Sequence, residues 1–136
     1  MAKNIRGFTL IELIIVIAIM TILSAGLLIF INPSQKMSEA RDRKRKNDVY
    51  TIYGALAQYS FLNNGLFPEV VTSSDIDAIE IEGFLVPEFL NEIPLDPTCS
   101  GETSSGYYVK KNEENEMEVT ASCAENEEII VDSIVF

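Results

Sequence analysis

The chain has 136 residues and a net charge of −11, with two cysteines, no histidine and no tryptophan. Without histidine it lacks the commonest general base, and two cysteines alone cannot complete a four-ligand zinc site. The charge is divided: residues 1–50 carry eight basic and four acidic side chains (+4), whereas residues 51–136 carry two basic and 17 acidic ones (−15), so the C-terminal part should repel nucleic acid.

An apolar segment from Phe8 to Ile31 contains 24 residues and a single charge, Glu12. As a helix it would be about 36 Å long, enough to cross the ~30 Å hydrocarbon core of a membrane. Lys3 and Arg6 before it fit the start of a secretory signal, but the apolar stretch is too long for one and no Ala-x-Ala cleavage site follows. We therefore expect a transmembrane helix, in which a buried carboxylate is costly and marks a functional residue.

The charges on either side of this segment leave its orientation open. Two basic residues precede it and six follow it within about 15 positions, which favours a cytoplasmic location for the C-terminal side. A disulfide between the two cysteines would instead require an extracytoplasmic location.

Residues 32–62 predict a second, amphipathic stretch of helix. Six positions at helical spacing, all but one apolar, predict a stripe that packs on another element. The stripe consists of Val49, Ile52, Tyr53, Leu56, Tyr59 and Ser60. Gly26 and Pro33 are the weak points of the combined helix. Because proline lacks an amide proton and clashes with the carbonyl four residues back, we expect a kink or local melting near Ile29.

A basic run lies near the start of this amphipathic helix, from Lys36 to Lys46. Three oppositely charged pairs at i, i+4 spacing indicate a solvated helix with surface ion pairs. These pairs are Glu39–Arg43, Asp42–Lys46 and Lys44–Asp48. Alternatively, the basic segment faces the acidic C-terminal part of neighbouring copies, which would make their association salt-sensitive.

Residues 63–136 predict a small head. Asn63-Asn64-Gly65 should end the helix, since glycine or asparagine supplies a left-handed cap. We expect a connecting loop with a short helix over 69–92. Strands are expected over 106–110, 116–122 and 128–135, with a turn at 111–115. The predicted class is α+β, with an antiparallel sheet packed on the long N-terminal helix.

The N-terminus carries a family resemblance. The sequence from Lys3 to Leu13, with Arg6-Gly7 followed by Phe8-Thr9-Leu10-Ile11-Glu12, resembles the class III signal of type IV pilins and type II secretion pseudopilins. Asn64-Gly65-Leu66-Phe67-Pro68 is similar to the element that ends the stalk helix in many members. Residues 93–109 resemble the family's head more loosely.

This resemblance implies processing and assembly. A prepilin peptidase would remove the leader, residues 1–7, by cutting between Gly7 and Phe8, and the new amino group of Phe8 would be N-methylated. Residues 8–31 would then form the filament core, 32–62 the stalk and 63–136 an extracellular head. The Glu12 carboxylate would neutralise the Phe8 ammonium of a neighbouring subunit, and the head would lie outside the cell.

Two further features of the head are open at this point. Cys99 and Cys123, if oxidised, would join the proline-rich loop to the end of the second strand and contribute about 3–4 kcal/mol to the free energy of unfolding. The alternative is two free buried thiols.

Acidic residues near Asp96 raise the question of calcium, which major pseudopilins bind. However, Asp96-Pro97-Thr98-Cys99 departs from their segment and no EF-hand spacing is present. We expect no other cofactor.

The resemblance favours a structural subunit, a type IV pilin that polymerises through its N-terminal helix into an extracellular filament. The alternatives are a secretion pseudopilin and a non-polymerising single-pass membrane protein with a ligand-binding acidic head. Expected partners are other copies of the chain, the prepilin peptidase, the inner-membrane assembly machinery and the membrane, but not nucleic acid. The precursor would lie in the inner membrane and the filament at the cell surface. We do not expect an enzyme, because no nucleophile motif or phosphate-binding loop is present.

Overall fold

The computed structural model describes residues 7–113 and 116–132, and the chain divides into two units between Met37 and Ser38. Helix α1 spans Leu10–Ile31 and helix α2 spans Pro33–Leu62. Asn32 separates them in the left-handed conformation (φ 45°). Pro33 opens α2, the first helical position, where its missing amide proton costs no hydrogen bond. The interruption thus lies at Asn32, whereas the backbone at Gly26 and Ile29 is helical.

Within the described part of the chain, no helix combines the length and the apolar character that crossing a membrane requires.

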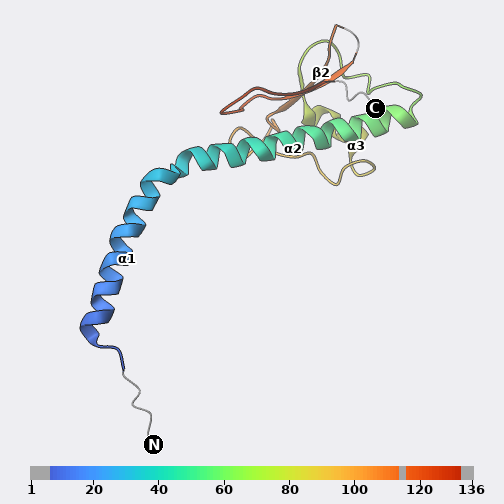
Figure 1. Cartoon of the computed structure of the whole chain (residues 1–136). Coiled ribbons are helices and arrows are strands. Elements are labelled where there is room, and N and C mark those ends of the chain that lie inside the picture. The colour runs from blue at the N-terminus through green and yellow to red at the C-terminus, as the bar shows by residue number, and fades with distance from the viewer. Residues whose placement is uncertain (1–6, 114–115, 133–136) are drawn as a thin grey trace, which may run out of the picture. The chain divides into compact units, whose positions relative to one another are not determined.

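The second unit contains a four-stranded antiparallel sheet in the order β1-β2-β3-β4 (Figure 1). The strands are Ile76–Asp77 (β1), Tyr107–Lys111 (β2), Met117–Ala121 (β3) and Ile129–Asp132 (β4). The register aligns Val109 with Val119, and Val119 with Val131. Since side chains alternate across a sheet, these three valines share one face, and all three are buried.

The core of this unit lies between the sheet and α2. Val49, Ile52 and Leu56 of α2 are completely buried in one apolar cluster with Tyr107 and Val109 of the sheet. Tyr53 and Tyr59 of the predicted stripe pack at the edge of the cluster. The predicted α+β class, with helix packed on an antiparallel sheet, is confirmed.

The predicted boundaries differ from the structure in detail. The end of α2 is as expected: Asn64 and Gly65 have positive φ, and the Gly65 amide donates to the Ser60 carbonyl (2.8 Å). The three predicted strands correspond to β2, β3 and β4, although positions 133–135 of the last one lie outside the described residues. The prediction for 69–92 missed the short strand β1. This segment also holds a 3₁₀ turn, η1 (Ala78–Ile81), and a single helical turn, α3 (Glu82–Leu85).

Gly106, just before β2, should not tolerate a side chain. Its φ is +84°, and an added Cβ would lie 2.6 Å from the Cβ of Asp96. We expect Gly106→Ala to lower the free energy of unfolding by at least about 2 kcal/mol, from backbone strain and overpacking together. Gly101→Ala is the matched control, because its Cβ would meet nothing within 4 Å. Tyrosine fluorescence during denaturation of the full chain reports this unit, since all five tyrosines lie between positions 50 and 108. Equal stability of the two variants would contradict the prediction.

Candidate functional site

The predicted cleavage position lies in extended, exposed chain ahead of α1. Gly7, Phe8 and Thr9 have no regular secondary structure, and the side chain of Phe8 is 86% exposed. The peptide bond between Gly7 and Phe8 is therefore not protected by helix hydrogen bonds. The basic residues of the signal, Lys3 and Arg6, lie outside the described residues.

Glu12 and Thr9 form a capping box at the start of α1. The Glu12 amide donates to Thr9 Oγ1 (3.3 Å), and the Thr9 amide donates to Glu12 Oε2 (3.5 Å). The box satisfies two amide protons that have no partner within the helix, and it places a negative charge at the positive end of the helix dipole. Thus Glu12 has an intramolecular role in addition to its predicted role between subunits.

The described side chains of α1 offer a broad apolar surface. Isoleucine, leucine, valine and methionine residues on every side of the helix are exposed through its first four turns. They are Leu10, Ile11, Leu13, Ile14, Ile15, Val16, Ile17, Ile19, Met20, Ile22 and Leu23. A helix that is apolar all round requires an apolar environment, either lipid or other protein.

The second unit is organised around Arg45, a completely buried arginine on α2. Its Nε donates to Asp96 Oδ2 (2.7 Å) and its Nη2 to Asp96 Oδ1 (3.3 Å), a two-pronged contact. Nη2 also donates to the Thr98 hydroxyl (2.6 Å). Asp96 Oδ1 also accepts from the amides of Thr98 and Cys99 (2.7 and 2.8 Å) and from the Thr98 hydroxyl (3.0 Å). The Asp96 carboxylate therefore binds both the Arg45 guanidinium and the backbone amides of the turn that follows Asp96.

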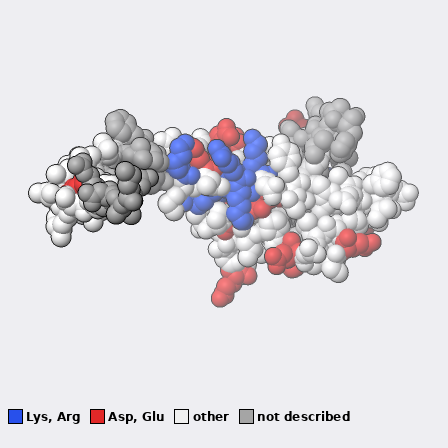
Figure 2. Space-filling model, turned by 60° about the horizontal axis from the view of Figure 1, so that its bottom comes forward, with Lys and Arg blue, Asp and Glu red and all other residues white. Residues whose placement is uncertain are grey.

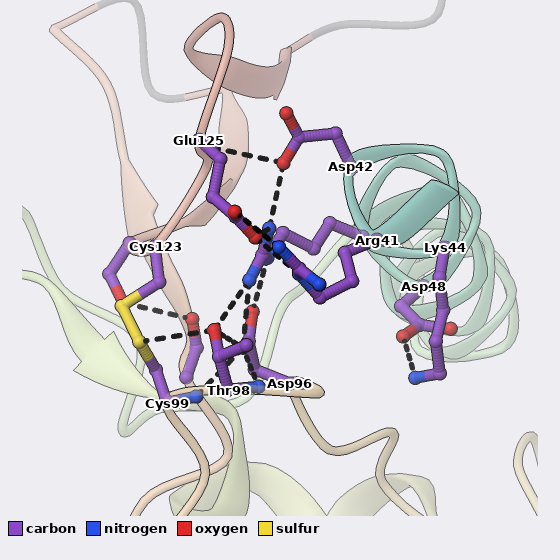
Figure 3. A network of polar contacts seen from close by, with 12 residues as sticks. Arg41, Asp42, Lys44, Asp48, Asp96, Thr98, Cys99, Cys123 and Glu125 are labelled. Atoms are coloured by element: carbon purple, nitrogen blue, oxygen red, sulfur yellow. Dashed lines mark hydrogen bonds and ion pairs between the residues drawn. A yellow bond between two sulfur atoms is a disulfide. The ribbon is translucent and has the colours of Figure 1, made fainter. Parts of the chain in front are cut away.

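A second set of contacts ties Arg45 to the loop after β3. Its Nη1 donates to Asp42 Oδ1 (2.7 Å) and Glu125 Oε1 (3.0 Å). Asp42 accepts from the amides of Glu125 and Asn126 (3.0 and 2.9 Å), and Glu125 forms a two-pronged ion pair with Arg41 (2.6 Å each). In Figure 3, Arg41 and Asp42 extend from α2, and Asp96 and Glu125 come from two different loops. We call this set of residues the Arg45 network.

The acidic members of the Arg45 network are held in the charged form. Burial alone would raise the pKa of Asp96, but hydrogen bonds from Arg45 and from the amides of Thr98 and Cys99 outweigh it and lower that pKa to about 2. Burial would also raise the pKa of Asp42. Hydrogen bonds from the 125–126 loop and from Arg45 outweigh this effect and lower that pKa to about 2. Hydrogen bonds from Arg41 and Arg45 lower the pKa of Glu125 to about 2.

The disulfide predicted between Cys99 and Cys123 is confirmed (Figure 3). Cys99 lies three residues after Asp96, and Cys123 lies two residues before Glu125. The crosslink therefore joins the two loops that bring carboxylates to Arg45. Since it closes a loop between positions 24 residues apart, it should stabilise this unit by about 3–4 kcal/mol in the chain-entropy model.

Asp96 is not available as a calcium ligand. Both of its oxygens accept hydrogen bonds from Arg45, and Oδ1 also accepts from two amides and a hydroxyl. Bound cations require carboxylate lone pairs that these contacts occupy. Across residues 7–113 and 116–132, no group of three or more Cys, Asp or Glu side chains is arranged to hold a metal ion.

Of the three predicted i, i+4 pairs on α2, Lys44–Asp48 is present (2.6 Å). Asp48 also accepts a hydrogen bond from the Tyr107 hydroxyl (2.7 Å), and Lys44 donates to the Leu95 carbonyl (3.0 Å). The Asp42–Lys46 prediction is wrong, because Asp42 points inward to Arg45 and the 125–126 loop. Arg43 forms no ion pair with Glu39 or any other carboxylate in the described residues.

The Arg45 network should fail in acid. The three carboxylates of the network have lower pKa values in the folded chain than in the unfolded chain. Their contribution to the free energy of unfolding is therefore complete above pH ~4.5 and is lost as the pH falls towards 2. We expect the tyrosine-monitored melting temperature of the full chain to stay constant from about pH 7 to 5 and to fall steeply below about pH 4. A melting temperature unchanged at pH 2 would contradict this assignment.

Removing the arginine should be far more damaging than removing its exposed neighbour. Arg45→Met leaves Asp96 and Asp42 buried without their cation, at a cost of about 3–5 kcal/mol. Arg43→Met on the exposed face of the same helix should stay within about 0.5 kcal/mol of the parent chain. Denaturant unfolding followed by tyrosine fluorescence measures both. A similar, small change in both variants would show that the network contributes little.

The N-terminal segment matches a known family model. Residues 2–28 match the model described as the prokaryotic N-terminal methylation motif. No curated protein sequence and no solved structure matches the chain. The matched segment contains Gly7, Phe8 and Glu12, and it supports the resemblance to the type IV pilin and pseudopilin family. The chain therefore carries the N-terminal signal of a type IV pilin-like or pseudopilin precursor.

Proposed function

We propose that the chain is a structural subunit of a type IV pilus, which polymerises through α1 into an extracellular filament. The observation that carries this proposal is the methylation motif at residues 2–28, which includes most of α1, a helix whose described apolar side chains are exposed on every side. A soluble monomer would be destabilised by such a surface, whereas a polymer can bury it in a core of parallel copies of α1.

The proposed maturation follows the order of the segments. The leader, residues 1–7, is removed by a prepilin peptidase at the exposed bond between Gly7 and Phe8, and the amino group of Phe8 is methylated. Residues 8–31 first anchor the precursor in the inner membrane; the sequence stays apolar through 27–31, beyond the described side chains of α1. The same residues then form the filament core, with the stalk (32–62) and head (63–136) outside the membrane.

Glu12 has a distinct role in each of these states. Before assembly its carboxylate serves the capping box, where the contact to the Thr9 amide, at 3.5 Å, is a long hydrogen bond. After cleavage, the Phe8 ammonium of a neighbouring subunit is a stronger partner, because opposite charges attract strongly in an apolar bundle and each is costly to bury alone. Correct axial placement of each new subunit would satisfy both charges.

A secretion pseudopilin is the second candidate, because it shares the signal and the Asn64–Pro68 element. Pro33 and the paired cysteines favour a pilin. A non-polymerising membrane protein with a ligand-binding head is a third candidate, and it differs from the other two in one respect: the charge of Glu12 would be irrelevant to its activity.

Glu12→Gln separates the polymerising candidates from the anchor. Glutamine also completes a capping box, so α1 keeps its N-terminal hydrogen bonds and loses only the charge. We expect cells that carry this variant to lose shed filaments while keeping the processed subunit, as measured by electron microscopy and immunoblotting of sheared fractions. Normal filament yields would rule out the proposed charge pair.

Thr9→Ala is the matched control for the cap. It removes the hydroxyl that accepts from the Glu12 amide, at a cost of about 1 kcal/mol, and keeps the carboxylate. Filaments should persist in this variant. If Thr9→Ala abolished them as completely as Glu12→Gln, helix capping rather than charge pairing would explain the requirement for Glu12.

A further inference from the structure

The outward face of α2 carries two cations, Arg43 and Lys46, that form no ion pair within residues 7–113 and 116–132. Arg43 and Lys46 lie one helical turn apart, both exposed, and they line a groove of about 250 Å³ together with Glu39, Asp42, Asn126 and Glu127. Among the described residues, no carboxylate lies within ion-pair distance of either side chain. Every other basic residue between 41 and 46 is engaged inside the unit: Arg41 with Glu125, Lys44 with Asp48, and Arg45 in its network.

The same unit contains a chain segment rich in exposed glutamates, residues 80–92. The sequence contains no lysine or arginine between Lys46 and Lys110. Within this stretch, four exposed glutamates follow one another through η1, α3 and the loop after α3, with no ion pair in the described structure. They are Glu80, Glu82, Glu88 and Glu92. Figure 2 shows the basic side chains gathered in one band, with acidic side chains beside them and further groups of acidic side chains protruding away from the band.

We propose that Arg43 and Lys46 of one copy dock against the Glu80–Glu92 surface of a second copy. The contact rests on the proposed polymer, in which each subunit, with a side-chain charge of −13 once Lys3 and Arg6 are removed with the leader (8 basic and 21 acidic residues), would otherwise repel its neighbours. Interleaving the unpaired cations with the unpaired glutamates of the next subunit reduces this repulsion and fixes the orientation of adjacent heads. Ion pairs at the rim of a contact chiefly set specificity and association rate, so this one selects the arrangement in which apolar α1 surfaces meet.

Charge exchange tests the contact directly. The variant Arg43→Glu/Lys46→Glu, and separately Glu82→Lys/Glu88→Lys, should reduce the yield of sheared filaments by about tenfold. Combining all four substitutions in one chain restores opposite charges across the contact, and it should bring the yield back to within about twofold of the parent. Glu102→Lys/Glu128→Lys is the control: it changes net charge as the second variant does, at exposed glutamates outside both surfaces, and should assemble normally.

The salt dependence of filament stability is a second test, and it needs no variant that might fail to fold. Filaments of the unmodified chain should dissociate increasingly as salt is raised from about 0.05 M to about 1 M, because screening weakens exposed ion pairs. Filaments equally stable over this range would overturn the proposal. The proposal would also be overturned if the variant with all four substitutions formed no more filaments than the double variants. Arg43 and Lys46 would then bind a different partner, such as an anionic lipid surface. Both results leave the polymer itself intact, whereas absence of filaments from the unmodified chain would contradict the proposed function first.

Discussion

The guanidinium of Arg45 has no exposed surface, and most of the second unit is arranged to satisfy it. A buried cation is tolerated only when several acceptors surround it. Here Asp42 comes from the same helix, Asp96 from the loop before β2 and Glu125 from the loop after β3. Because each carboxylate also holds backbone amides or a second arginine, fixing Arg45 fixes both loops against α2. The disulfide between Cys99 and Cys123 joins the same two loops and limits how far they can separate.

This arrangement divides α2 into two faces with different roles. The inward face combines the Arg45 network with Val49, Ile52 and Leu56, and it attaches the sheet to the helix. The outward face keeps Arg43 and Lys46 available to other molecules. A head held rigidly on its helix can present a defined surface to neighbouring copies, and rigid presentation lowers the entropic cost of repeated contacts in a polymer. In the proposed polymer, the apolar surface of α1 would provide the driving force for association, and the charges would select its geometry.

Much of the fold could be predicted from local patterns. The helical spacing of Val49, Ile52 and Leu56 predicted the buried face of α2. The strand predicted over 116–122 corresponds to β3, in which buried Met117, Val119 and Ala121 alternate with partly exposed residues. Strand β1 was missed since two residues are too few to establish a period. The signal around Phe8 was recognisable because its residues are contiguous in sequence.

The Arg45 network was not predicted, because two of its three carboxylates, Asp96 and Glu125, lie 51 and 80 residues from Arg45 and only the folded chain brings them together. Charge content suggested that Arg45 belonged to a solvated run. One signal did exist: Arg45 precedes Val49 by four residues and so continues the buried stripe towards the N-terminus. The sequence Thr9-x-x-Glu12 ahead of an apolar run also matches a capping box, so the capping role of Glu12 was predictable. The apolar, membrane-like surroundings of Glu12 instead suggested a partner in another subunit.

In the proposed maturation, removal of residues 1–7 converts a precursor into a filament subunit that begins at Phe8. The decisive measurement is mass spectrometry of the N-terminal peptide from fibres sheared off the cells, with the fibres first identified by electron microscopy. We expect fibres built of this chain, each copy beginning at an N-methylated Phe8. Fibres whose subunits retain residues upstream of Phe8, or cells that process the chain at Phe8 and form no fibres, would contradict it.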